Sequence, residues 1–182
     1  MDLVDLIAEK GFLGQDFLTW LWWKSEERGG SILLPEEGDI TVSFEKHMLL
    51  TSGEGESSEK LICTGLQTEL QEARTGLRMG KKLEQARIVL NHMSYEYGFT
   101  LGASMMEFRS VRLPKTEATE KEGGASPEEV EGMVLERIFL FEELVKLVNA
   151  LFRMFLTVRL GGEWRGEVQS IRAWIEKRAA VE

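Results

Sequence analysis

The sequence predicts an α+β protein with a mainly antiparallel sheet of about five strands. Period-2 alternation of apolar residues occurs near residue 40 and again between residues 85 and 113, and helical spacing of apolar residues lies between them. Short connections favour antiparallel neighbours, and helices grouped apart from the strands are typical of α+β proteins. The 182 residues fit one domain that spans the whole chain.

Residues 1–28 predict helix, interrupted at Gly14 and ended by Gly29 and Gly30, because glycine adopts the left-handed conformation readily. The part from Gln15 to Arg28 is rich in tryptophan and apolar all round, so it needs burial by the core or by a partner chain. The aromatic residues expected in the core or a dimer interface, from this helix and the long helix below, are Phe17, Trp20, Trp22, Trp23, Phe141, Phe152 and Phe155. An alternative for the tryptophan cluster is stacking on nucleic-acid bases.

Strands and a middle helix follow. Alternation over residues 40–44 predicts a half-buried strand, the Gly-, Ser- and Glu-rich stretch 51–58 a hairpin loop, and residues 61–64 a returning strand. Apolar residues at helical spacing over 66–77 predict an amphipathic helix that ends near Gly80.

Three more strands are expected at residues 85–92, 95–101 and 105–113, with a turn at 102–104 before the last. Residues 114–125 are rich in Lys, Glu, Thr and Gly and predict a polar linker.

A long helix begins after this linker. Ser126, Pro127 and Glu129 form the sequence pattern of a capping box with proline in the first turn. The helix is expected to reach about Val158, and residues 127–158 would span about 48 Å. Two adjacent apolar stripes run along it, a face wide enough to contact the sheet, the Trp-rich helix or a second subunit. A final short helix follows Gly162.

Catalytic and metal-binding patterns are weak. The stretch 76–82 differs from a phosphate-binding loop because its glycines are separated by three residues and Lys82 follows Lys81 where Ser or Thr is needed. His47, His92 and Cys63 show no zinc-binding spacing. We expect His92 to be a hydrogen-bonded interior histidine and Cys63 a buried inert thiol, so no enzyme activity, cofactor, metal or small-molecule substrate is predicted.

The net charge of −9 disfavours a protein coated in positive charge. The charge is uneven, however: residues 1–60 carry a net −8, residues 61–115 a net +3, and residues 116–182 a net −4. If the central basic residues converge, they could contact phosphates; a solvated basic face is the alternative. The candidate DNA-binding residues are Arg74, Arg78, Lys81, Lys82, Arg87, Arg109 and Arg112.

Residues 12–26 read FLGQDFLTWLWWKSE, and residues 66–114 contain a helix pattern followed by strand patterns. The first stretch resembles the opening of short members of the recombination-associated RdgC family, and the second resembles the later part of its longer members. The second match comprises a helix with Glu69 and Glu72, Gly80-Lys81 leading into 83–90, Phe99-Thr-Leu101, and a last strand with Phe108, Val111 and Leu113. The longer members have an additional N-terminal portion that has no counterpart in this sequence.

The resemblance implies a non-catalytic protein that binds double-stranded DNA without strong sequence preference, forms a homodimer and modulates recombination at the nucleoid. The alternative is a protein-interaction or scaffold domain that does not bind DNA. The acidic start lacks the pattern of a signal peptide and no long apolar run is present, so a cytoplasmic protein without a membrane partner is expected.

Overall fold

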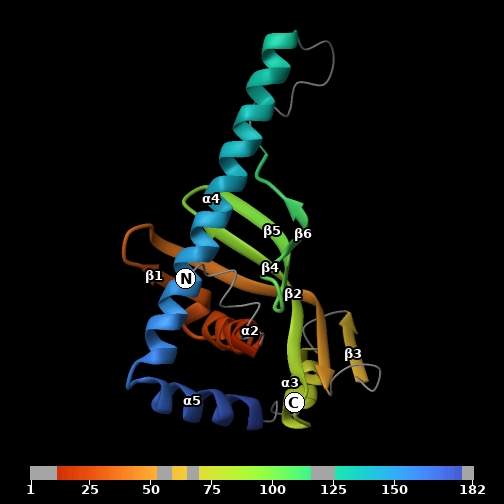
Figure 1. Cartoon of the computed structure of the whole chain (residues 1–182), viewed down its shortest axis with the longest axis vertical. Helices are drawn as coiled ribbons and strands as arrows, with labels where there is room; N and C mark the ends of the chain where they lie inside the picture. Colours follow the sequence, from red (N-terminus) through yellow and green to blue (C-terminus); the bar gives the residue numbers. More distant parts are fainter. Residues whose placement is uncertain (1–11, 53–58, 65–69, 116–125, 178–182) are drawn as a thin grey trace.

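The computed structural model describes residues 12–52, 59–64, 70–115 and 126–177, and Figure 1 shows how they are arranged. The predicted α+β class is confirmed, with the Trp-rich first helix, the middle helix, the long helix and the final short helix all present. The elements in chain order are α2 (Phe12–Glu26), the 3-10 helix η1 (Arg28–Gly30), β1 (Ser31–Leu34), β2 (Gly38–Ser52), β3 (Glu59–Thr64), α3 (Leu70–Arg78), β4 (Lys82–His92), β5 (Tyr95–Gly102), β6 (Phe108–Arg112), α4 (Pro127–Leu160) and α5 (Trp164–Glu176).

Within the described residues, the sheet has six antiparallel strands, one more than expected. Its order is β1-β2-β4-β5-β6, and β3 also pairs with β2. The additional strand is β1, which forms a hairpin with the start of β2. Strand β2 continues to Ser52, and its pairing with β4 shifts register between Phe44 and Met48 and again near Leu50. Such irregularities bend and twist a strand, and β2 curves strongly in Figure 1.

The described helices cover one face of this sheet. Helix α2 packs on β2 and β4, α3 packs on β2, β3 and β4, and α5 contacts α2, α3 and α4. On β4 and β5, the alternate residues that point toward these helices are fully buried: Ala86, Ile88, Leu90, Tyr97, Phe99 and Leu101. Burial raises the pKa of the Tyr97 hydroxyl, and the Glu143 carboxylate raises it further.

Gly14 does not interrupt the first helix as expected; it lies inside α2. A Cβ atom at this position would lie 1.9 Å from the carbonyl oxygen of Ala103, which follows β5. Glycine therefore permits a close approach of the helix to the sheet rather than a break. Gly29 and Gly30 do have the predicted left-handed conformation, with φ of 69° and 81°.

Two carboxylates fasten α5 to α2. Glu167 of α5 accepts a hydrogen bond of 2.8 Å from the indole nitrogen of Trp20, and its other oxygen lies 3.2 Å from Lys24 Nζ. Glu26 of α2 accepts a 2.8 Å hydrogen bond from the indole of Trp174. The last helix is thus attached by charged groups at the edge of an aromatic core.

Helix α4 has two different parts. The predicted capping box is confirmed, since Ser126 accepts a hydrogen bond from the Glu129 amide and the Glu129 carboxylate accepts one from the Ser126 amide. Every buried residue of the helix lies at or after Leu140. The earlier turns extend beyond the sheet (Figure 1).

The sequence-based expectations for residues 1–11, for most of the hairpin loop, for Leu66 and for most of the linker fall outside the described residues.

Candidate functional site

The seven basic residues predicted to contact DNA form two groups. One group comes from α3 and the turn after it. The Arg74 guanidinium forms an ion pair with Glu26 and lies over the ring of Trp174, 4.7 Å from its centroid. Lys81 Nζ lies 2.8 Å from the carboxylate of Glu59 and holds the pKa of that carboxyl below its usual range. Both cations are therefore already paired with carboxylates of the same chain.

The other group lies on strands β4 and β6. Arg87 stands between two buried residues of β4, so it points to the sheet face away from the helices. It also donates a hydrogen bond of 2.6 Å to the carbonyl of Ser110. Each arginine of the group is paired with a glutamate: Arg87 with Glu45 at 3.3 Å, Arg109 with Glu107 at 2.5 Å, and Arg112 with Glu96 at 3.3 Å.

Arg78 and Lys82 are exposed, and neither forms an ion pair with a described residue. Arg78 donates a hydrogen bond to the hydroxyl of Thr75 at 3.3 Å. The structure divides the seven predicted residues between two surfaces and pairs five of them with glutamates. A DNA phosphate would have to displace those glutamates, which lowers the gain expected from counterion release.

The aromatic candidates divide more simply. Phe17, Trp20, Trp22, Trp23, Phe152 and Phe155 are buried, six of the seven. The ring of Phe155 contacts four other aromatic rings, those of Phe17, Trp20, Phe152 and Trp164. These six side chains therefore belong to the core of the chain, rather than to a dimer interface or a surface that stacks on bases. Phe141 differs, because it is 39% exposed and contacts only one ring, that of Phe108 at 5.9 Å.

The residues able to act as nucleophiles or metal ligands do not form a catalytic group in the part of the chain that the structure describes. Cys63 is buried in β3, whereas His47 is exposed on the neighbouring strand. His92 is half-buried, and its Nε2 lies 3.0 Å from the carbonyl oxygen of Glu37, as expected of a hydrogen-bonded histidine. No set of His, Cys, Asp and Glu side chains among the described residues is arranged to hold a metal ion.

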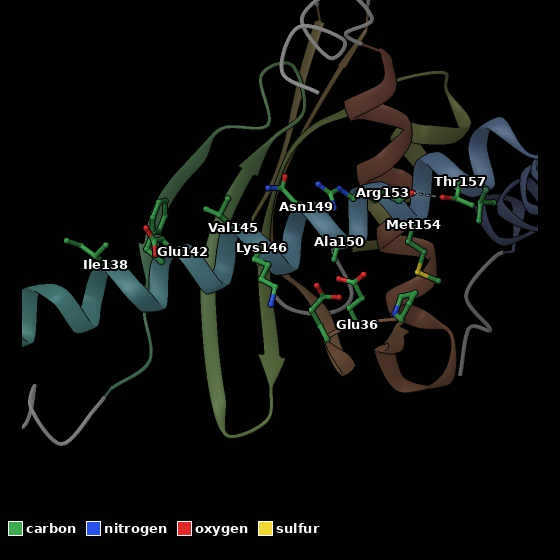
Figure 2. Close-up of a pocket in the computed structure, with 14 residues that line it drawn as sticks. Glu36, Ile138, Glu142, Val145, Lys146, Asn149, Ala150, Arg153, Met154 and Thr157 are labelled. Atoms are coloured by element: carbon green, nitrogen blue, oxygen red, sulfur yellow. Dashed lines mark hydrogen bonds between the residues drawn. The ribbon is translucent and has the colours of Figure 1, made fainter. Parts of the chain in front are cut away.

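A concave surface, the α4 groove, runs along helix α4. It has a volume of about 910 Å³, and one wall is the turn between β1 and β2 (Figure 2). From Ile138 to Val158 it follows α4 for about 30 Å. The residues that line it are Pro35, Glu36, Glu37, Ile138, Phe141, Glu142, Val145, Lys146, Asn149, Ala150, Arg153, Met154, Thr157 and Val158.

Two cations stand in the α4 groove without a carboxylate partner. Lys146 and Arg153 are exposed on α4, and neither forms an ion pair with any residue in the described ranges. The helical spacing of Glu142 and Lys146 permits a pair, yet none forms. Figure 2 shows Lys146 and Arg153 on the same helix as the apolar side chains Ile138, Val145 and Met154.

Exposed apolar side chains continue from this groove toward the N-terminus of α4. Their exposed fractions lie between 45% and 59%, unusual for large apolar groups on one short stretch. These residues are Val130, Val134, Leu135, Ile138 and Phe139. Together with the groove, they form a continuous exposed apolar surface along α4.

Sequence reasoning found one side of this site and missed the other. The two apolar stripes of α4 form a face wider than a two-stranded coiled coil needs, which predicted contact with the sheet, the Trp-rich helix or a second subunit. The wall formed by Pro35, Glu36 and Glu37 was not anticipated. Its only sequence signal is that a proline and a glycine, Gly38, flank two glutamates, as in a turn between strands.

None of the described helices combines the length and hydropathy needed to cross a membrane. Comparisons of the chain with family models, curated proteins and solved structures give no match.

Proposed function

We propose that this protein is a non-catalytic interaction module whose α4 groove receives an amphipathic helix of a protein partner. The observation that carries the proposal is the combination, on one helix face, of an apolar groove and two cations that form no ion pair with the residues that the structure describes. A helix laid into an apolar groove is a common mode of peptide recognition, in which residues at i, i+3, i+4 and i+7 make the contacts.

The shape of the groove favours a helix over a small molecule. A small-molecule site usually encloses its ligand and places a few polar groups around it. The α4 groove instead follows one helix for about 30 Å, a length that matches about five turns of a second helix. Its two cations, Lys146 and Arg153, lie seven residues apart, or two helical turns, and suit acidic side chains spaced in the same way. The groove is also lined by three carboxylates, Glu36 and Glu37 on the opposite wall and Glu142 on α4, which suit basic side chains on the same bound helix.

Binding of designed peptides tests this function. The probe is a fluorescent helical peptide of about 18 residues, with leucines at i, i+3, i+4 and i+7 and glutamates elsewhere. Its counterpart carries lysines in place of the glutamates. Fluorescence anisotropy should show the acidic peptide binding at least about tenfold more tightly than the basic one.

Ile138→Glu should abolish binding of the acidic peptide, because it places a carboxylate in the apolar floor of the groove. Met79→Glu is the matched control, since Met79 is 74% exposed at the end of α3 and is not part of the groove. Equal affinities for both peptides, or equal effects of the two substitutions, would count against the proposal.

A second proposal is RdgC-like association with duplex DNA. Its support is the resemblance of residues 12–26 and 66–114 to that family, together with the net positive charge of residues 61–115. Arg78 and Lys82 are the candidates best placed to act, because both are exposed and outside ion pairs with described residues. Restraint of recombinase filaments would be the cellular role that the family resemblance implies.

Titration of a random duplex at low salt tests the second proposal. If both cations contact phosphates, replacing Arg78 and Lys82 by alanine should reduce the slope of log K against log salt by about 0.9 for each contact. Replacing Arg137 and Arg165 by alanine is the control for net charge, because both are exposed and outside the predicted set. The absence of any binding at low salt would eliminate this proposal.

A further inference from the structure

We infer that the occupant of the α4 groove is the first half of α4 from a second copy of this chain, so that two copies pair with their α4 helices antiparallel. The inference rests on the proposed function, since it names the partner of the same groove. It follows from the charge, the exposed apolar residues and the position of α4.

Helix α4 carries opposite charge at its two ends. Residues 127–143, the first half, contain six glutamates and one arginine, a net charge of −5. Residues 144–160, the second half, contain one lysine, two arginines and no carboxylate, a net charge of +3. Arg159 is paired with Asp16 of the same chain, so Lys146 and Arg153 are the cations that face a second copy. Two such helices repel when they lie parallel in register and attract when they lie antiparallel, because each half then meets its opposite.

The apolar residues fit the same arrangement. The first half exposes Val134, Leu135 and Ile138, which lie at i, i+1 and i+4 and project toward one side of the helix. The groove offers Val145 and Met154 on the second half. An amphipathic acidic helix and a groove with cations and apolar groups are therefore both present on one helix, which is the condition for a self-complementary two-fold interface.

A two-fold axis near Phe141 brings together both the opposite charges and the apolar residues of two antiparallel α4 helices. Such an axis places residues 128–136 of one copy opposite residues 146–154 of the other. Glu131 of one copy then lies within a turn of Arg153 of the other, and Phe141 lies near its own counterpart. The first turns of α4 extend beyond the sheet, so the rest of the described chain leaves them accessible to a second copy (Figure 1).

Charge reversal in two variants tests this pairing. The first variant, Lys146→Glu with Arg153→Glu, has two acidic halves. The second, Glu128→Lys with Glu131→Lys, gains positive charge in the first half. Sedimentation velocity on the full chain should show a dimer for the wild type, and each variant alone should dimerise at least about tenfold more weakly.

An equimolar mixture of the two variants should dimerise more tightly than either variant alone. The unchanged first half of one variant (−5) then meets the unchanged second half of the other (+3), and the reversed charges at positions 128 and 131 lie near the reversed charge at position 153. Circular dichroism checks that each variant is folded. If the substitutions weakened the dimer by disturbing the fold of each chain, mixing the two variants would not restore it.

Three results would overturn the inference: a wild-type chain that stays monomeric, a dimer that charge reversal leaves unchanged, or variants that mixing does not rescue. The peptide assay, run at protein concentrations where the chain is monomeric, separates this failure from failure of the proposed function. If the acidic peptide binds but the chain does not pair, the groove serves the helix of another protein. If the peptide does not bind either, both proposals fail.

Discussion

Removing the Glu167 side chain should weaken the attachment of the last helix more than its partly exposed position suggests. Glu167→Ala deletes the acceptor for the Trp20 indole and the ion-pair partner of Lys24 at the same time. Trp20 is fully buried, so its N–H has no access to water in compensation. Glu163, the exposed residue immediately before α5, forms no side-chain cap hydrogen bond and provides the control.

The size of the effect can be worked from these contacts. A hydrogen bond to a charged group contributes about 1.5–3 kcal/mol, and an ion pair whose side chains are 22% and 21% exposed adds at most about 1 kcal/mol. Glu167→Ala should therefore lower the free energy of unfolding by about 2 kcal/mol, equivalent to a fall in Tm of about 4–8 °C for a chain of this size. Glu167→Gln retains an acceptor oxygen and should lose about half as much.

Urea unfolding followed by tryptophan fluorescence measures the loss and reports directly on Trp20. Glu163→Ala should change the free energy of unfolding by about 0.5 kcal/mol or less. If Glu167→Ala is no more destabilising than Glu163→Ala, the carboxylate does not hold α5 in place and the reasoning fails.

Three further substitutions test the fold. Gly14→Ala should cost about 3 kcal/mol of unfolding free energy, since its Cβ would meet the Ala103 carbonyl at 1.9 Å; an unchanged urea midpoint would mean that the helix does not approach the sheet this closely. Phe155→Ala should cost about 3–5 kcal/mol because four aromatic rings surround this fully buried residue, and a loss below about 1 kcal/mol would remove it from the core. The Lys81–Glu59 pair lowers the pKa of Glu59, so its stabilisation is present above the ordinary value of 4.5 and lost as the pH falls below it. Lys81→Met should therefore flatten the fall in stability as the pH drops below 4.5; a wild-type slope in the variant would show that the pair does not form.

Much of the fold followed from local patterns. Ser126, Pro127 and Glu129 set the start of α4, and the structure has the complete capping box at that position. Gly14 illustrates the limit of prediction from local sequence. A glycine at this position predicts a helix break, whereas in the structure it allows a neighbouring backbone segment to approach the helix closely. Only the tertiary structure shows that the neighbour is Ala103, which is 89 positions away in the sequence.

The missed strand β1 shows a second limit. It has four residues, too few for the alternation of Ile32 and Leu34 to be distinguished from a chance pattern. Its existence depends on pairing with β2, which is a property of the folded chain.

The candidate site was less predictable than the fold. Sequence identifies the charge of Arg74 or Arg87 but not the glutamate that each one meets, since Glu26 and Glu45 lie on other elements. Most of the predicted basic residues of segment 61–115 therefore form ion pairs within the chain instead of a free basic surface. The α4 groove was also hidden, because its second wall comes from a turn about 100 residues earlier in the chain.

The division of α4 at Leu140 has a consequence for how the helix is formed. The 13 residues from Pro127 to Phe139 include no buried side chain, and a helix of that length is only marginally stable in water without tertiary support. Their amide protons should exchange by local fraying, whereas those after Leu140 should exchange only with global unfolding. Covering the first half would therefore complete its folding as well as its binding, and part of the binding free energy would be spent on ordering the helix.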